Sequence, residues 1–525
     1  MIFFNILFAI FPFQYKIKVC LQKAFLPWRS SMHKCSAHIH MQIIVLSLLI
    51  AILFCFCTAD MDERTPLITP KSESSAEKTD SLSQNGITFY FDTHIEYGKF
   101  ANGDYWVKGP VKITNITPEF DGKHNGWEVN PMPTGPLGFD ERISDFDPSI
   151  VPDLPYIAEP GQSIVKAISR EPYSETASMK TRLQKAAVLT ILEQAPTNSE
   201  KLFRPPYVGR NKVFYSIESI RTELLPSLQY VSGAPTLDEI ESKFKPVQMN
   251  HRAGLATAYM PPLEHLGNYA SSNATRFNYS VLRLMLDDPI EEKMGALIAL
   301  LQCGIDYYHV TLEGQMWPRG GGEQPGNKLP IVFFATMMGY NNIKQHVKEL
   351  KLYEDYLTFY GKDSVVLWGD FGWEYGHSIE QYWRSIALDN TTRTIADPHG
   401  YIDGGKTPGG GYQYCCTSKP FKGTVLCLLL MPEMLDIWHP KALIDYVDRW
   451  VEFGTWTQPD PCAPPDTNWE NYGVTFGEDP NNPGDCIRDT DSSDGIGRFP
   501  DRHGVNADKG SYGSPFIDSM WDVYR

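Results

Sequence analysis

The hydrophobic period of the chain changes near Tyr215, and this change limits the folds that the sequence can adopt. Between residues 86 and 210, short runs such as DYWVKGPVKITNIT and KAAVLTILE combine β-branched and aromatic residues, and turn residues separate the runs. In the first of these runs, Val107, Val111 and Ile113 lean toward the period of two that a half-buried strand requires. The sequence therefore predicts a β-sandwich-like domain over residues 86–210.

Beyond this point the apolar residues recur at helical spacing. The clearest helix starts at Asp288, which can cap it, and Pro289 suits the first helical position. A second helix is expected from Ser378, where Gln381 completes a capping-box spacing, and a third is expected to end at Gly454. Their apolar stripes are Met294, Leu297, Ile298, Leu301 and Ile305, then Ile379, Tyr382, Trp383 and Ile386, and finally Leu443, Tyr446, Val447, Trp450 and Val451. Less regular helices are predicted at 217–229, 276–287, 330–338, 344–357 and 423–437.

Helices without a strand pattern between them indicate an all-α domain over residues 211–454, so the whole chain is predicted to be α+β and multidomain. Residues 455–525 are rich in Asp, Asn, Gly and Pro and are expected to be a loop-rich extension. Residues 60–85 contain much Ser, Thr, Glu and Lys with almost no large apolar residue, which predicts a disordered linker.

The first 59 residues are rich in apolar side chains and contain no acidic one. The run from Met41 to Cys57 is followed by the small residues Thr58 and Ala59, which predicts a cleaved secretory signal when the chain is read from Met32. The alternative is an uncleaved signal anchor, for which the apolar run is marginally long enough. Both interpretations place the rest of the chain outside the cytosol, and membrane contact is expected only through such an anchor.

Sequons and cysteines agree with a secreted protein. The sequons predict N-glycosylation at Asn115, Asn273, Asn278 and Asn390. Cys462 and Cys486 lie in loop-like sequence and are predicted to form a disulfide bond. Cys303 and Cys427 lie in apolar runs and are equally compatible with buried free thiols.

The net charge of −16 argues against a nucleic-acid partner, because phosphate binding requires a cationic surface. Carboxylates in the tail are spaced closely enough to suggest Ca²⁺ ligands, at Asp489, Asp491 and Asp494. Their spacing differs from the EF-hand pattern, so a solvated acidic loop is the simpler interpretation. No other cofactor is expected.

Three segments interrupt the helical region, at residues 314–330, 368–377 and 389–421. They combine Trp and Tyr with carboxylates, amides, His and Arg, and this mixture suits a sugar because its C–H faces stack on aromatic rings while its hydroxyls need polar partners. The side chains predicted to bind substrate are Trp317, Glu323, Trp373, Asp403 and Tyr412. His251 and His309 are further candidates, although a structural role would explain either of them.

These features together resemble the helical-toroid polysaccharide lyases of the alginate-lyase and heparinase-like type. The resemblance covers residues 216–454 and is strongest from Gln302 through Trp317 to Ile331. It implies an α/α toroid that cleaves a uronate-containing polysaccharide by β-elimination. In one departure from these enzymes, the β-rich region precedes the helices here, whereas in many of them it follows. In another, Glu323 occupies a position where a basic or imidazole group is expected.

In such lyases an amide, Arg or His neutralises the uronate carboxylate, His or Tyr removes the C5 proton, and Tyr commonly protonates the leaving oxygen. The resemblance assigns neutralisation to Asn327 or Arg319 and proton removal to His377. It assigns protonation of the leaving oxygen to Tyr375 or Tyr414.

Two other functions stay open. A glycoside hydrolase would need two carboxyl groups, about 5–5.5 Å apart for retention and about 6.5–9.5 Å apart for inversion, and Asp370, Glu374 and Asp403 are the candidates. A non-catalytic glycan-binding or extracellular-matrix protein is the other alternative.

Overall fold

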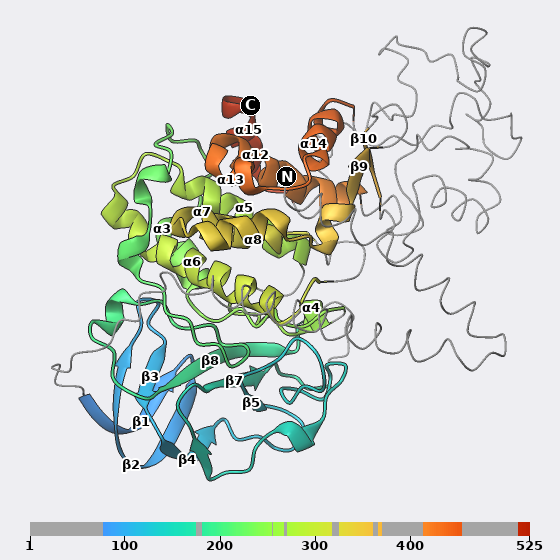
Figure 1. Cartoon of the computed structure of the whole chain (residues 1–525). Helices are drawn as coiled ribbons and strands as arrows, with labels where there is room; N and C mark the ends of the chain where they lie inside the picture. The colour runs from blue at the N-terminus through green and yellow to red at the C-terminus, as the bar shows by residue number, and fades with distance from the viewer. Residues whose placement is uncertain are drawn as a thin grey trace, which may run out of the picture. The chain divides into compact units, whose positions relative to one another are not determined.

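The computed structural model describes residues 77–174, 181–254, 256–266, 270–317, 325–360, 366–369, 413–453 and 513–525. These residues form a mixed β-sheet followed by helices (Figure 1). The strands of the sheet are β1 (Glu77–Gln84), β2 (Ile87–Lys99), β3 (Tyr105–Lys108), β4 (Val111–Thr117), β5 (Trp127–Val129), β6 (Tyr156–Ala158), β7 (Ser163–Ser169) and β8 (Leu183–Leu192). The helices include α3 (Leu237–Phe244), α4 (Ala256–Tyr259), α5 (Ala270–Leu284), α6 (Ile290–Leu312), α7 (Lys328–Met338), α8 (Asn341–Glu349), α12 (Ser418–Leu430), α13 (Pro432–Ile437), α14 (Ala442–Phe453) and α15 (Pro515–Tyr524).

The sheet is curled and follows the order β5-β7-β8-β3-β2-β4-β6, with β1 also paired to β2. Neighbouring strands are antiparallel except β3 and β8, which run parallel with Tyr105 opposite Leu189. The long strand β2 pairs with β4 near its start and with β3 near its end. One strand therefore belongs to both halves of the curled sheet.

Two cores lie on opposite faces of β7 and β8. In β8, Ala187, Leu189 and Ile191 belong to a core formed by the sheet itself. The alternate residues Ala186 and Val188 belong to a second core, which also contains residues of α5, α6 and α7. The predicted β-sandwich is therefore wrong, because helices occupy the place of a second sheet. Period-two alternation identifies the buried faces of a strand but not the element that covers each face.

Helix α6 is buried along most of its length, and every residue from Ala299 to Thr311 is buried. It begins at Ile290 with Pro289 as its N-cap, within one residue of the predicted start. Gly304 allows the close approach of α7, because a Cβ at this position would lie 2.5 Å from the carbonyl oxygen of Pro330. A larger residue at position 304 would force the two helices apart.

The helices pack on one another and on the sheet, and a short hairpin of β9 (Thr358–Tyr360) and β10 (Val366–Trp368) lies in the same region. The predicted all-α toroid is therefore wrong. Helical periodicity gives the buried side of each helix but not its neighbours, so it does not distinguish a toroid from helices packed on a sheet.

Local predictions had mixed outcomes. The helix predicted to end at Gly454 is confirmed as α14, whereas the helix predicted from Ser378 lies outside the described residues. Two single 3₁₀ turns replace the helix predicted at 217–229. Strand β1 occupies part of the predicted linker, and α15 lies in the predicted loop-rich extension. None of the helices in the described ranges is both long and apolar enough to cross a membrane.

Candidate functional site

Two of the side chains predicted to act on a substrate, Asn327 and Trp317, belong to the described residues. The backbone of Tyr414 lies in the π-helical turn Gln413–Thr417. The other predicted site residues lie outside the described ranges, namely Arg319, Glu323, Asp370, Trp373, Glu374, Tyr375, His377, Asp403 and Tyr412. The same is true of the predicted disulfide, calcium and fourth glycosylation residues, Cys462, Cys486, Asp489, Asp491, Asp494 and Asn390.

Asn327 is part of a buried group of amide and hydroxyl side chains. The Nδ2 atom of Asn250 lies 2.8 Å from Oδ1 of Asn327 and 3.1 Å from the hydroxyl oxygen of Tyr307, and it donates to both. Burial raises the pKa of Tyr307 far above its ordinary value, so its hydroxyl keeps its proton. Oδ1 of Asn250 is buried and has no hydrogen-bond partner among the residues that the structure describes. The group therefore holds a proton donor and an unused polar atom side by side.

His251 follows Asn250 directly and is fully buried. Its Nδ1 lies 3.0 Å from the hydroxyl oxygen of Tyr207, and its ring packs edge-on against Phe139. Burial and the neighbouring charge of Arg252 lower the pKa of His251 to about 3, so the ring is neutral at ordinary pH. When Nδ1 carries the proton and donates it to Tyr207, Nε2 presents a lone pair, and no residue in the described part of the chain forms a hydrogen bond with Nε2.

Trp317 and Gln315 hold the main chain of this segment. Nε1 of Trp317 donates to the carbonyl of Asn250 at 3.1 Å, and Nε2 of Gln315 donates to the carbonyl of His251 at 3.0 Å. Trp317 is 2% exposed, and its ring lies beside that of Tyr307, with the ring centroids 5.6 Å apart. Trp317 therefore positions Asn250 and His251, and its role in binding sugar stays a prediction.

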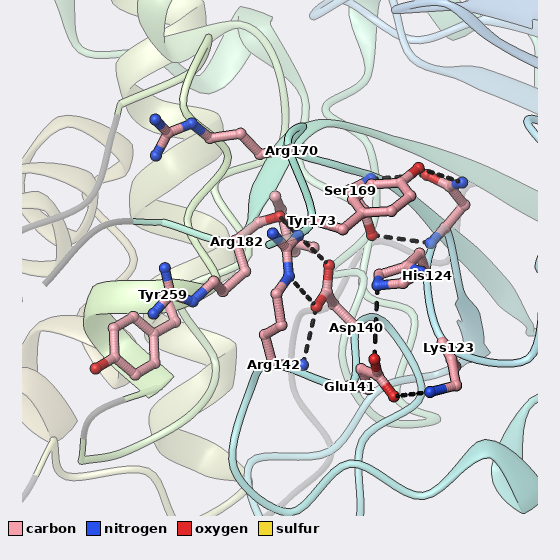
Figure 2. A network of polar contacts seen from close by, with 12 residues as sticks. Lys123, His124, Asp140, Glu141, Arg142, Ser169, Arg170, Tyr173, Arg182 and Tyr259 are labelled. Atoms are coloured by element: carbon pink, nitrogen blue, oxygen red, sulfur yellow. Dashed lines mark hydrogen bonds and ion pairs between the residues drawn. The ribbon is translucent and has the colours of Figure 1, made fainter. Parts of the chain in front are cut away.

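Polar contacts also join the sheet region to Tyr259 of α4, as Figure 2 shows. The guanidinium of Arg182, beside the start of β8, lies 4.7 Å above the ring of Tyr259, and its backbone N–H donates to the carbonyl of Tyr259. Arg142 donates from Nη2 to the carbonyl of Arg182 and forms a two-bond pair with Asp140. These contacts tie the end of α4, in the segment that follows His251, to the start of β8.

A buried ion cluster positions the segment that carries Tyr207. Nε of Arg204 lies 2.6 Å from Asp104, in the turn between β2 and β3, and Nη2 of Arg204 pairs with Asp306 of α6. All three side chains are at most 5% exposed. Arg204 therefore links the sheet, α6 and the Tyr207 segment at one point.

The other predicted features have clear positions. Cys303 and Cys427 are buried free thiols, in agreement with one of the two interpretations of their apolar surroundings. Nε2 of His309 forms a hydrogen bond with the hydroxyl of Tyr215 at 3.0 Å. His309 and His251 therefore have different neighbours. No group of three or more His, Cys, Asp or Glu side chains in the described part of the chain is placed to hold a metal ion.

Burial separates the three described sequons. Asn278 is fully buried and Asn273 is 6% exposed, and Nδ2 of Asn278 donates to the carbonyl of Pro420 at 2.6 Å. A glycan on either amide would occupy space that the folded chain fills, which argues against these two predicted acceptors. Asn115 lies partly exposed on β4, and its Nδ2 donates to the exposed Glu119 at 3.1 Å.

We therefore expect a secretory host to glycosylate Asn115 in the folded protein and not Asn273 or Asn278. Mass spectrometry of the intact protein and of Asn115→Gln should differ by one glycan, whereas Asn273→Gln should keep the full mass. A folded protein carrying a glycan on Asn278 would contradict the expectation.

Comparisons of the chain with protein-family models, with curated proteins and with solved structures gave no match. The function therefore has to be derived from the chemistry of the described side chains. Among these, Tyr207, Tyr307 and Gln315 were not predicted from the sequence. The run of polar residues within the otherwise apolar helix α6 was a signal for Tyr307 alone.

Proposed function

We propose that this chain is a carbohydrate-active enzyme that cleaves a uronate-containing polysaccharide by β-elimination, with its site around Asn250, His251 and Asn327. One observation carries the proposal. A neutral histidine with an unpartnered Nε2 adjoins an amide pair and two protonated tyrosines. Buried polar atoms without partners are uncommon in folded proteins, and a catalytic role is one established reason for them.

Elimination next to a uronate requires three functions within hydrogen-bond reach of the reacting atoms. The side-chain NH₂ of Asn327, whose Oδ1 is held by Asn250, can donate to the carboxylate, which makes the C5 proton more acidic and stabilises the charge that develops. His251 is neutral and can accept the C5 proton at Nε2. As the C4–O bond breaks and a C4–C5 double bond forms, a tyrosine hydroxyl gives a proton to the leaving oxygen.

Tyr207 and Tyr307 are the two hydroxyls that can supply this proton. Burial raises the pKa of each far above its ordinary value, so both are protonated before the reaction. Tyr207 touches His251 directly, and Tyr307 touches Asn250. Tyr207 is therefore also able to pass a proton between the base and the leaving group.

The product distinguishes this proposal from its alternatives. Incubation with a panel of uronate polymers should give chain ends that absorb in the ultraviolet, because elimination leaves a sugar with a double bond conjugated to its carboxylate. New reducing ends without this absorbance would contradict the lyase and indicate a hydrolase. Binding to a polymer without any cleavage would instead indicate a glycan-binding protein.

The proposed compartment is extracellular or lumenal. It is supported by the apolar segment from Met41 to Cys57, which precedes the folded body, and by the exposed sequon at Asn115. A polysaccharide substrate would be available to the enzyme in that compartment.

A further inference from the structure

Asn327 stands at the N-cap of α7 without capping it. Asparagine is a favoured N-cap residue because its side-chain oxygen accepts an N–H of the first helical turn. In this protein Asn327 makes no side-chain cap bond, and its Oδ1 accepts from Asn250 instead. The third helical residue is Pro330, which has no N–H, so one of the two usual cap donors is missing.

Glu354 takes over the capping. Its carboxylate is buried in the 3₁₀ turn Tyr353–Tyr356. Oε2 accepts the backbone N–H of Gly326 at 3.0 Å, and Oε1 accepts the backbone N–H of Lys328 at 2.6 Å. One carboxylate thus holds the peptide groups on both sides of Asn327.

The two neighbours of Asn327 are fixed independently. Gly326 has φ of 95°, and a Cβ at this position would lie 2.3 Å from Cβ of Ala274 on α5. The Lys328 ammonium lies 2.7 Å from Oδ2 of Asp355 and also donates to backbone carbonyls, one of them that of Leu350. The main chain at Asn327 therefore has little freedom, and its side chain is aimed at Asn250.

From this arrangement we infer that Glu354 is a positioning residue, which releases the amide of Asn327 from helix capping and holds it against Asn250 in the substrate site. The expected effect on activity rests on the proposed function, whereas the expected effect on the position of Asn327 does not. Glu354 itself is bonded to main chain on either side of Asn327 and is assigned no contact with the reacting atoms. Burial raises the pKa of Glu354 to about 7, and the two N–H bonds act in the opposite direction by favouring its ionised form.

Glu354→Gln keeps the size of the side chain but places an NH₂ group against a backbone N–H. Glutamine has a single oxygen and accepts only one of the two N–H groups that Glu354 binds, so the Asn327 oxygen is expected to turn toward the first turn of the helix. The side-chain amide signals of Asn327 and Asn250, in protein labelled with ¹⁵N at asparagine, should both shift. With a cleavable uronate polymer, kcat should fall on the order of 100-fold, the effect of a displacement of about 1 Å, with a smaller change in KM.

Glu128→Gln is the matched control. Glu128 is also buried, accepts a backbone N–H from Gly138 at 2.6 Å, and has its pKa raised to about 7 by burial. Its replacement should lower thermal stability comparably while leaving the Asn327 amide signal and kcat unchanged. If Glu354→Gln does not fold, Glu354→Asp keeps the charge but shortens the reach, and it should shift the same amide signals.

The amide signals test the positioning role of Glu354, and the cleavage assay tests the proposed lyase activity. Unchanged Asn327 and Asn250 signals in a folded Glu354 variant would overturn the positioning role, whatever the activity. A shift in these signals supports the role even if the wild-type protein cleaves no polymer, and in that case the proposed function alone fails. Loss of activity of equal size in the Glu128 control would also overturn the inference, because it would show a general effect of lost stability.

Discussion

Replacement of His251 by glutamine is expected to lower kcat on a uronate polymer by about 10²–10⁴-fold, the usual contribution of a general base. Glutamine keeps a polar group of similar size beside Tyr207 but has no basic nitrogen to accept the C5 proton. The wild-type ring is neutral because burial and Arg252 lower its pKa to about 3. A bound uronate carboxylate raises that pKa again, since a nearby negative charge favours the protonated ring, and this increases the strength of the base.

The pH dependence of the unbound enzyme follows from the same pKa. Because His251 stays neutral down to about pH 3, kcat/KM should not fall on its account between pH 7 and pH 5. An ordinary histidine base, with a pKa near 6.5, would lose most of its activity over that interval. Initial rates measured across the interval at constant ionic strength test this expectation.

His309→Gln provides the control for His251→Gln. His309 is also buried, has its pKa lowered to about 4 chiefly by burial, and bonds to a tyrosine, Tyr215. It lacks the amide neighbours of His251, so its replacement should leave kcat near the wild-type value. Equal losses in the two variants, or full activity of His251→Gln, would remove His251 from the mechanism.

Both histidines also affect stability, with the same sign. Their folded pKa values lie below the ordinary value of 6.5, so the unfolded chain binds more protons as the pH falls. Their neutral forms contribute stability that is complete above about pH 6.5 and is lost toward pH 4. The wild-type protein should therefore lose stability in acid partly through these two residues.

The sequence predicted individual elements better than their arrangement. Helix α14 and the start of α6 follow from apolar spacing and from a proline, which are local properties. The layers depend on which surfaces meet, and β8 shows the difficulty. Its successive residues Ala186 and Ala187 face two different cores, one closed by helices and one by the curled sheet. A run that is apolar on both faces does not show what covers either face.

The candidate site was only partly predictable for a similar reason. Asn327 was predicted to neutralise a carboxylate, and its neighbour Asn250, which holds the oxygen of the Asn327 amide, was not predicted. Tyr207, His251 and Tyr307 are far apart in sequence and meet only because the Arg204 cluster and α6 bring their segments together. The role assigned to His377 stays a prediction, since that residue lies outside the described part of the chain.

Replacement of Arg204 by methionine is expected to have the largest effect on stability. The side chain of Arg204 is fully buried and pairs with Asp104 and Asp306, which are 2% and 5% exposed. Methionine fills a similar volume but leaves two buried carboxylates without their cation, at a cost of about 3–5 kcal/mol in the free energy of unfolding. Urea unfolding followed by circular dichroism should show the loss. Because Tyr207 follows in the same segment, activity should fall as well.

The pH dependence of the stability of Arg204→Met distinguishes the effect of an unpaired buried carboxylate from the effect of poor packing. Burial raises the pKa of Asp306 from 3.8 to about 6, and Arg204 opposes this rise. The folded protein therefore holds this proton more tightly than the unfolded chain, and the contribution of protonated Asp306 is complete below about pH 3.8 and lost as the pH rises through 6. Without Arg204 the pKa of Asp306 rises further, so the deficit of Arg204→Met should be smaller at pH 5 than at pH 8.

The double variant Arg204→Met with Asp306→Asn removes one of the two stranded charges. It should be more stable than Arg204→Met at pH 8, and its stability should change less with pH between 5 and 8, because the group that titrates there is gone. A deficit of Arg204→Met that is the same at both pH values and persists in the double variant would mean that packing around Arg204, and not its charge, holds the sheet to α6. The charge explanation requires both the pH effect and the rescue, because each depends on the Asp306 carboxylate being ionised and unpaired.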